Sequence, residues 1–252
     1  MRFLIGVLLL LSLSEVYAAT TGVTLTHLTG SIYLVEDSHY AKTNSLVYIG
    51  QKSVTVIGAT HTPETAKLLA EEIRQITDNP ISEVINTDYN PEYAGGNAYW
   101  KDIGADIVAT ELTSTLLARE WDKVGDFTRR YFPNYPQVPL VLPTITYSSN
   151  FELQEGRIQA LYLGPSHTPD DIFIYFPGEK VLYAGSILKE HLGNLAFADI
   201  GEYQRTLMKL KHQQLDIHTV ISGHWSAIHG PELIDQYLQM LKAYAGKSGD
   251  DK

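Results

Sequence analysis

The chain has 252 residues, of which 44% are hydrophobic and 19% charged, as is ordinary for a globular protein with a substantial core. Its formal net charge of −10 argues against a nucleic-acid partner, because phosphate binding needs clustered lysine and arginine. The chain contains no cysteine, so it forms no disulfide and offers no thiolate to a metal ion.

The N-terminus has the three-part pattern of a secretory signal peptide. Met1 and Arg2 form a short positive region, residues 3–11 are apolar apart from one glycine, and a polar stretch leads to Val16 and Ala18. The apolar run is too short to span a bilayer, and small residues at the last two positions favour cleavage after Ala18.

We therefore predict a signal peptide at residues 1–18 and a single domain at residues 19–252. No later segment reaches the roughly 18 to 20 continuous apolar residues of a membrane helix. The mature protein is expected to be secreted, periplasmic in a Gram-negative source, and free of the membrane once the signal is cleaved.

The first half of the chain predicts a β-meander followed by helices and a further strand. Apolar stretches separated by glycine or polar turns predict strands at residues 23–28, 31–35, 45–49 and 54–57. Thr62 and Pro63 then begin a helix, because threonine caps free amide groups and proline suits the first helical position. A strand at residues 83–86 and a helix from residue 113 to about residue 130 follow.

The second half repeats this arrangement. The sequence predicts strands near residues 139–142, 157–163, 172–176, 181–184 and 218–221. It also predicts a helix at about residues 203–211 and a last helix that begins at Pro231. Strands mixed with helices in both halves indicate one α/β domain, with two sheets covered by helices on their outer faces.

Four polar segments follow directly after predicted strands, at residues 86–97, 164–170, 185–189 and 222–225. Loops at strand ends are where functional side chains usually lie.

The motifs of these segments resemble those of a known family. They are VINT at 84–87 with AGGNAYW at 94–100, GPSHTPD at 164–170, LYAGSILK at 182–189 with LGNL at 192–195, and GH at 223–224 with HGPEL at 229–233. Their order and spacing, from about Val23 to Tyr244, are similar to the metallo-β-lactamase family, and most similar to its mono-zinc, carbapenem-hydrolysing subclass. The resemblance implies a four-layer αβ/βα sandwich with a zinc cleft at one edge.

The sequence departs from that subclass at the metal positions. In the subclass the first loop reads Asn-x-His-x-Asp, and the zinc is held by that Asp, a Cys and a His. Four positions are changed here: Asp88 at the first, Asn90 at the His, Glu92 at the Asp and Ser186 at the Cys. The two family histidines that remain are His167 and His224.

These substitutions change what the site can bind. The Ser186 hydroxyl stays protonated near neutral pH and replaces a thiolate poorly, holding at most a water or a weak metal contact. Glu92 keeps the carboxylate but moves it outward by roughly one C–C bond, about 1.5 Å, and Asn90 offers only a neutral amide oxygen. Two carboxylates and two imidazoles remain as candidate ligands of zinc or a harder divalent ion: Asp88, Glu92, His167 and His224. The alternative is a hydrogen-bonded polar pocket without metal.

The resemblance also implies roles in catalysis. The family opens a β-lactam amide by attack of a metal-activated water, and here Glu92, or Asp88 acting through a water, is the predicted base. Lys189 matches the lysine that pairs with the substrate carboxylate, and Asn194 matches a residue that orients the substrate; for both, a solvated structural role is the alternative. Ser186 as a nucleophile is disfavoured because the G-x-S-x-G turn is missing.

Three functions therefore compete. The first is a metal-dependent hydrolase that opens a carbapenem-like β-lactam or a related substrate. The second is a pseudoenzyme that binds a small carboxylate or a protein partner without turnover. The third is a metallo-hydrolase with another substrate. For all three we expect a monomer, and for the hydrolases a small-molecule substrate.

Overall fold

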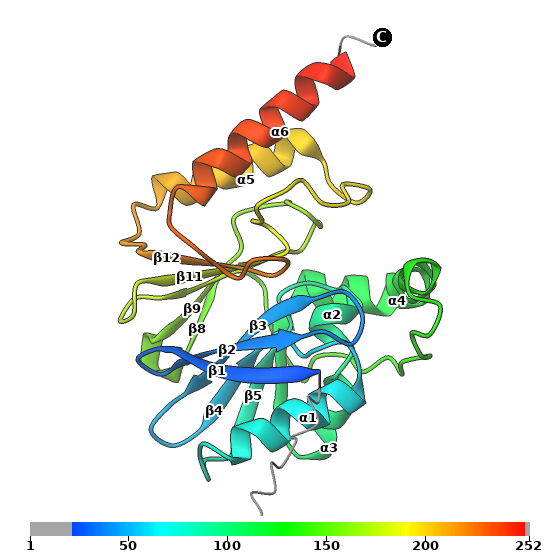
Figure 1. Cartoon of the computed structure of the whole chain (residues 1–252), viewed down its shortest axis with the longest axis vertical. Coiled ribbons are helices and arrows are strands. Elements are labelled where there is room, and N and C mark those ends of the chain that lie inside the picture. The colour runs from blue at the N-terminus through cyan, green and yellow to red at the C-terminus, as the bar shows by residue number, and fades with distance from the viewer. Residues whose placement is uncertain (1–21, 250–252) are drawn as a thin grey trace, which may run out of the picture.

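Two mixed β-sheets packed face to face form the centre of the protein, as the computed structural model of residues 22–249 shows (Figure 1). The first sheet contains β1 (Val23–Thr29), β2 (Ile32–Asp37), β3 (Thr43–Ile49), β4 (Val54–Ile57), β5 (Ile81–Ile85), β6 (Asp106–Thr110) and β7 (Ile145–Tyr147). The second contains β8 (Phe151–Leu153), β9 (Ile158–Leu161), β10 (Phe173–Phe176), β11 (Val181–Gly185), β12 (Thr219–Ser222) and β13 (Ile228–His229).

The helices lie outside and beside these sheets. They are α1 (Pro63–Arg74), α2 (Pro91–Ala94), α3 (Asn97–Asp102), α4 (Glu111–Tyr131), the 3₁₀ turn η1 (Gln154–Gly156), α5 (Ile200–His212) and α6 (Leu233–Gly249). The signal-peptide prediction for residues 1–18 lies outside the described residues. Within residues 22–249, no helix is both long and apolar enough to cross a membrane.

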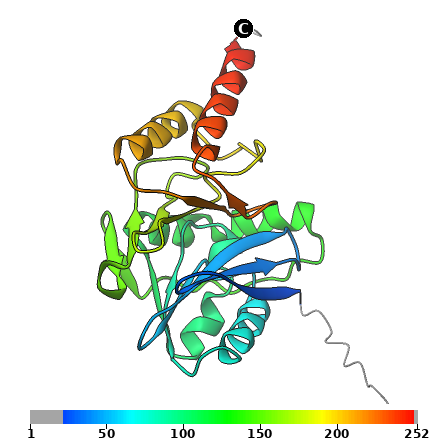
Figure 2. The ribbon, with the colours of Figure 1, turned by 60° about the vertical axis from the view of Figure 1, so that its left-hand side comes forward.

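Three layers of apolar contact confirm the predicted four-layer sandwich. The two inner sheet faces meet in a core that includes Leu46, Ile57, Ile174 and Phe176. A second core joins the outer face of the first sheet to α1 and α3, and a third joins the second sheet to α5 and α6. The order of layers is therefore helix, sheet, sheet, helix, as two views of the ribbon show (Figures 1 and 2).

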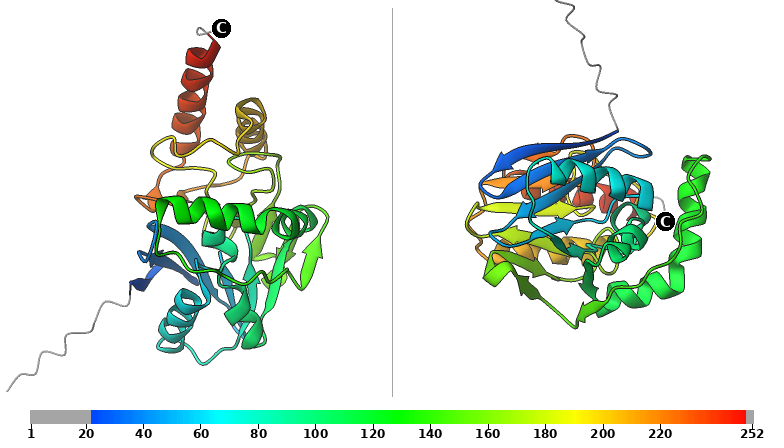
Figure 3. Two further views of the ribbon diagram at one scale, coloured as in Figure 1. Left: turned by 90° about the vertical axis from the view of Figure 1, so that its right-hand side faces the viewer. Right: turned by 90° about the horizontal axis from the view of Figure 1, so that it is seen from below.

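The long helix α4 is an exception to this layering. It runs along one side of the sandwich instead of covering an outer face (Figure 3). Its inward residues Leu117, Trp121 and Val124 form a separate apolar cluster with Tyr89 of the loop after β5 and with Val138. The helix thereby gives the loops at this edge of the sheets a side wall.

The topology brings the polar loops together. Strands β4 and β5 are parallel in the first sheet, and β11 and β12 are parallel in the second. The carboxyl ends of parallel strands lie at one edge of a sheet, where ligands commonly bind. An isolated bridge between Thr43 and His224, and a hydrogen bond from the Asn44 amide to the Gly223 carbonyl, join the two sheets at this edge.

Local sequence signals account for the best-predicted helix. The Thr62 hydroxyl accepts a hydrogen bond from the Thr65 amide at 3.2 Å, the Thr65 hydroxyl accepts one from the Thr62 amide at 3.1 Å, and Pro63 is the first helical residue. This reciprocal cap satisfies amide groups that a helix start leaves open. The prediction that α1 begins at this pair is confirmed.

One predicted strand is wrong. Residues 139–142 form no regular strand, although Leu140 and Leu142 are apolar; both are about 40% exposed. Pro139 is the first residue of the segment and Pro143 directly follows it, and neither can donate a backbone hydrogen bond to a neighbouring strand. The sheet instead continues through β6 and β7, which are five and three residues long and were not predicted from the sequence. The last helix begins at Leu233, two residues after the predicted Pro231.

Candidate functional site

The first polar loop follows β5 and places Asp88 beneath the cleft. Its side chain is buried, and one carboxylate oxygen accepts a hydrogen bond from the Asn90 amide at 2.7 Å. The other oxygen has no hydrogen-bond partner among the described residues. Burial raises the pKa of Asp88 well above its usual range, and the carboxyls of Asp171 and Asp170 raise it further. One of the two carboxylate oxygens of Asp88 is therefore bound to the backbone of its own loop.

The loop between β9 and β10 holds a buried acid pair behind His167. Asp170 accepts a hydrogen bond from the Thr168 hydroxyl at 2.8 Å, and Asp171 accepts one from the Ser166 hydroxyl at 2.9 Å. Burial raises the pKa of Asp170 to about 7 and that of Asp171 to about 6. Burial also lowers the pKa of His167 well below its usual value, so this residue is a neutral imidazole at neutral pH.

The loop after β11 carries Ser186 and Lys189. The Ser186 hydroxyl is buried and has no hydrogen-bond partner of normal geometry among the described residues. The Lys189 side chain is only 2% exposed, and its ammonium makes no hydrogen bond or ion pair within residues 22–249. Burial lowers the pKa of Lys189 to about 8, although the carboxylates of Asp171 and Glu92 oppose this change. A buried cation without a direct partner is costly unless something else pairs with it.

His224 follows β12 and faces Glu92. Its Nδ1–H donates to the Lys42 carbonyl at 3.2 Å, and because a carbonyl only accepts, Nε2 is left as the unprotonated acceptor. Burial lowers the pKa of His224 to about 4, with Glu92 opposing the change. Nε2 lies 3.8 Å from Glu92 Oε1. Two acceptors therefore face the same space, which suits a ligand hydrogen-bond donor or a cation.

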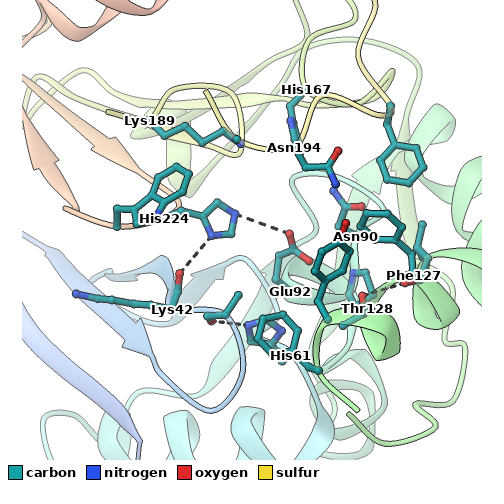
Figure 4. A pocket seen from close by; sticks show the side chains of 18 residues that line it. Lys42, His61, Asn90, Glu92, Phe127, Thr128, His167, Lys189, Asn194 and His224 are labelled. Atoms are coloured by element: carbon teal, nitrogen blue, oxygen red, sulfur yellow. Dashed lines mark hydrogen bonds and ion pairs between the residues drawn. The ribbon is translucent and has the colours of Figure 1, made fainter. Parts of the chain in front are cut away.

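These loops enclose a cavity of about 400 Å³. Figure 4 places Lys189, His224 and Glu92 on one side of it and Phe127 and Thr128 of α4 on the other. The full lining contains several apolar and aromatic side chains in addition to its charged groups: Val124, Phe127, Tyr131, Phe132, Phe197 and Trp225. The cavity thus has a polar end and an apolar wall.

The structure brings most of the predicted site residues to this cavity. Those that line it are Asn90, Glu92, His167, Lys189, Asn194 and His224. Asp88 and Ser186 are buried and are not part of its lining. The Asn194 side chain oxygen accepts a hydrogen bond from the Ala196 amide at 2.8 Å, so it also shapes its own loop.

The residues present do not fit zinc as the family's Asp, Cys and His set would hold it. Among the described residues, no three His, Cys, Asp or Glu side chains converge where they could hold one metal ion. The chain has no cysteine, and a neutral hydroxyl at Ser186 is a poor ligand for zinc. Zinc binding therefore stays a prediction from the resemblance. The polar side chains described above line or adjoin a cavity, but they do not form a metal-ligand set.

From sequence, His61 could either face the cleft or be only a neighbour of the helix cap at Thr62. In the structure it is buried and lines the cavity, and its Nε2 lies 2.9 Å from the Thr43 hydroxyl. Sequence reasoning missed other residues of this site. Asp170 and Asp171 could have been found from the sequence, because they are two adjacent acids at the end of a candidate metal loop. The aromatic residues of α4 could not, since their spacing is equally typical of a helix that faces the core.

Comparison with known proteins decides the family. The family model described as the metallo-beta-lactamase superfamily matches residues 41–224. The chain belongs to this superfamily. That match covers the first three polar loops and the fourth as far as His224, so the predicted resemblance to the metallo-β-lactamase family is confirmed. The particular likeness to the mono-zinc subclass stays a prediction.

Individual metallo-β-lactamases support the same assignment. A "Metallo-beta-lactamase type 2" of Elizabethkingia meningoseptica is 27% identical over 210 residues, which cover 79% of this chain and 78% of that protein. Another, of Bacteroides fragilis, is 21% identical and covers 88% and 86%. The solved structure of TMB-1 matches with a TM-score of 0.77 at 18% identity over 89% of this chain and 99% of that one. VMB-1 matches with a TM-score of 0.77 at 22% identity over 90% and 99%. These two structures show the shared fold.

Proposed function

We propose that this protein binds a small carboxylate of the β-lactam class in its cleft, with Lys189 as the anchor for the carboxylate. The observation that carries this proposal is the buried ammonium at the cavity, which has no hydrogen bond or ion pair among the described residues. A ligand carboxylate would supply a charge-assisted hydrogen bond to it. The family position of this lysine supports the same role.

The remaining lining suits the rest of such a ligand. An aromatic and aliphatic wall from α4 and from Phe197 lies across from the charged end. β-Lactams combine a carboxylate with a compact ring system and an apolar substituent, and binding sites commonly pair an apolar lining with a few fixed polar groups. His224 Nε2 and Glu92 Oε1 offer two acceptors to an amide N–H of the ligand.

In this proposal the ligand is held without zinc-dependent ring opening. The thiolate is missing, and one imidazole position carries Asn90, whose amide is neutral and cannot act as a base. One oxygen of Asp88 accepts a hydrogen bond from the Asn90 amide, and Asp88 is not among the residues that line the cavity. This corresponds to a pseudoenzyme that keeps the family's carboxylate-binding end.

A second function, metal-dependent hydrolysis of the same ligand, is favoured by one observation. Buried polar atoms without partners gather around the cleft, and three belong to residues at family metal positions: Asp88 Oδ2, His167 Nδ1 and Ser186 Oγ. Such atoms usually have a partner in a functional protein. A hard divalent ion would find oxygen donors here, with Glu92 as the predicted base for water.

One experiment separates the two functions. Binding of benzylpenicillin and of a carbapenem to the purified mature protein is measured by calorimetry, and ring opening is followed by ultraviolet absorbance with added Zn²⁺, Mn²⁺ or a chelator. We expect saturable binding, no stoichiometric metal, and no turnover under any condition. Turnover that a chelator abolishes would favour the hydrolase, and the absence of binding to either compound would contradict both functions.

The affinity for the carboxylate should depend on pH through Lys189. The free-state pKa of about 8 means that the ammonium is charged below pH 8 and loses its proton above it. Because the ligand pairs with the charged form, affinity should be constant between about pH 6.5 and 7.5 and fall roughly tenfold per unit above pH 8. The ionisable groups that interact electrostatically with this ammonium are Asp88, Glu92, His167, Asp171 and His224. An affinity that rises through pH 8 would contradict the role of Lys189.

We also propose that the mature protein is an exported monomer. The N-terminal pattern of residues 1–18 supports export, with cleavage after Ala18. N-terminal sequencing of the secreted or periplasmic protein would show a chain that begins at Ala19. Light scattering of the same sample would show the monomer mass.

A further inference from the structure

Trp225 combines an unusual backbone conformation with a place in the cleft lining. Its φ is +55°, in the left-handed region that bulky side chains rarely adopt. The side chain lines the cavity and is 42% exposed, whereas Trp100 and Trp121 are buried. A strained, exposed indole in a binding cleft is a feature that packing alone does not require.

The backbone around Trp225 is held from both sides, which is what lets such a conformation persist. The Asn44 side chain donates to the carbonyls of Ser222 at 3.0 Å and of Trp225 at 3.3 Å. The Gly223 amide donates to the Gly185 carbonyl at 2.8 Å. The indole therefore projects from a fixed loop and not from a mobile one.

Neighbouring rings also restrict the indole. Its ring centroid lies 5.6 Å from that of His191 and 6.1 Å from that of His224, both in edge-on arrangements. Phe127 and Phe132 also line the cavity, and Figure 4 shows Phe127 across from His224, the chain neighbour of Trp225. Two aromatic surfaces, one on the β12–β13 loop and one on α4, thus border the same cavity.

We propose that Trp225 and the aromatic face of α4 clamp the apolar substituent of the ligand, so that Trp225 selects ligands that carry an aromatic group. This inference rests on the proposed carboxylate-binding function and adds the substituent to it. Contacts between aromatic rings add binding free energy beyond that gained from burying their apolar surface. The indole, which packs beside His191 and His224 on the side of the cavity that faces α4, thereby acts as a specificity-determining residue.

The test compares two probes on three proteins. The probes are benzylpenicillin and the bare penicillin nucleus, which keeps the carboxylate and lacks the phenylacetyl group. The proteins are the wild type, Trp225→Asn and Ile228→Asn. Asparagine tolerates the left-handed conformation, and Ile228 is a matched control because it is 56% exposed in β13 and does not line the cavity.

We expect Trp225→Asn to lower the affinity for benzylpenicillin about tenfold and the affinity for the bare nucleus by less than about twofold. Ile228→Asn should change neither affinity. The melting temperature of Trp225→Asn should stay within about 2 °C of the wild type, because the substitution relieves strain as it removes ring contacts. In the wild type, benzylpenicillin should quench the fluorescence of the exposed indole. Equal affinities of wild type and Trp225→Asn for benzylpenicillin would overturn the clamp.

A further probe keeps this test separate from the proposed function. If benzylpenicillin does not bind the wild type, the proposed function fails, and anilinonaphthalene sulfonate, an aromatic anion, is titrated into the same proteins. Weaker dye binding by Trp225→Asn alone would still support an aromatic clamp. Equal dye binding by all three proteins would overturn it.

Discussion

The triple variant Asn90→His, Glu92→Asp, Ser186→Cys is expected to bind one zinc ion per chain at least a hundredfold more tightly than the wild type. Changes around a metal ligand alone alter affinity by about 10 to 100-fold, and here the ligands themselves change. Cysteine supplies the anionic sulfur that zinc prefers, and aspartate withdraws the carboxylate by about 1.5 Å. His167 and His224 are already present and are neutral at pH 7.

Competition with a chromophoric chelator measures this gain, and cobalt substitution would show whether a thiolate binds. The matched control is the same variant with Ser186→Ala in place of cysteine, which should recover only a small part of the affinity. The Ser186 hydroxyl is buried without a hydrogen-bond partner of normal geometry among the described residues, so both replacements remove the same hydroxyl and differ only in the thiolate. A wild type that already binds zinc as tightly as the triple variant would contradict our conclusion that its side chains do not fit zinc.

Lys189→Met is expected to weaken carboxylate binding and to stabilise the fold at the same time. Loss of a charge-assisted hydrogen bond of about 1.5–3 kcal/mol lowers affinity about 10 to 150-fold. The lowered pKa of Lys189, about 8 instead of 10.5, means that burying the charged form is unfavourable at neutral pH. Methionine fills a similar volume without charge, so the free energy of unfolding should rise by about 1–3 kcal/mol.

The control for this variant is Lys42→Met. Lys42 lines the same cavity, but its ammonium pairs with Glu36 at 2.6 Å and its side chain is half exposed, so affinity and stability should change little. Calorimetry gives the affinities, and urea unfolding gives the stabilities. A Lys189→Met protein that is less stable than the wild type, or that binds the carboxylate equally well, would show that this lysine has a structural role.

Much of the fold follows from local sequence. The alternation of apolar residues predicted β1 to β4, and the capping pair Thr62 and Pro63 fixed the start of α1. These signals work because they concern neighbouring residues, whose pattern is the same in any tertiary context. The wrong strand at residues 139–142 shows the limit of such signals. The segment has the apolar residues of a strand, but in the structure it pairs with no other strand.

The sequence by itself determined the family motifs, the absence of a thiolate and the identity of the side chains that replace the family ligands. Only the tertiary structure decided what these side chains do. It buried Asp88 and Lys189, left the Lys189 ammonium without an ion pair among the described residues, and placed Trp225 in the lining of the same cavity as Phe127 of α4. This arrangement depends on contacts between segments far apart in the chain, such as that of the Lys42 carbonyl with His224, so no local pattern encodes it.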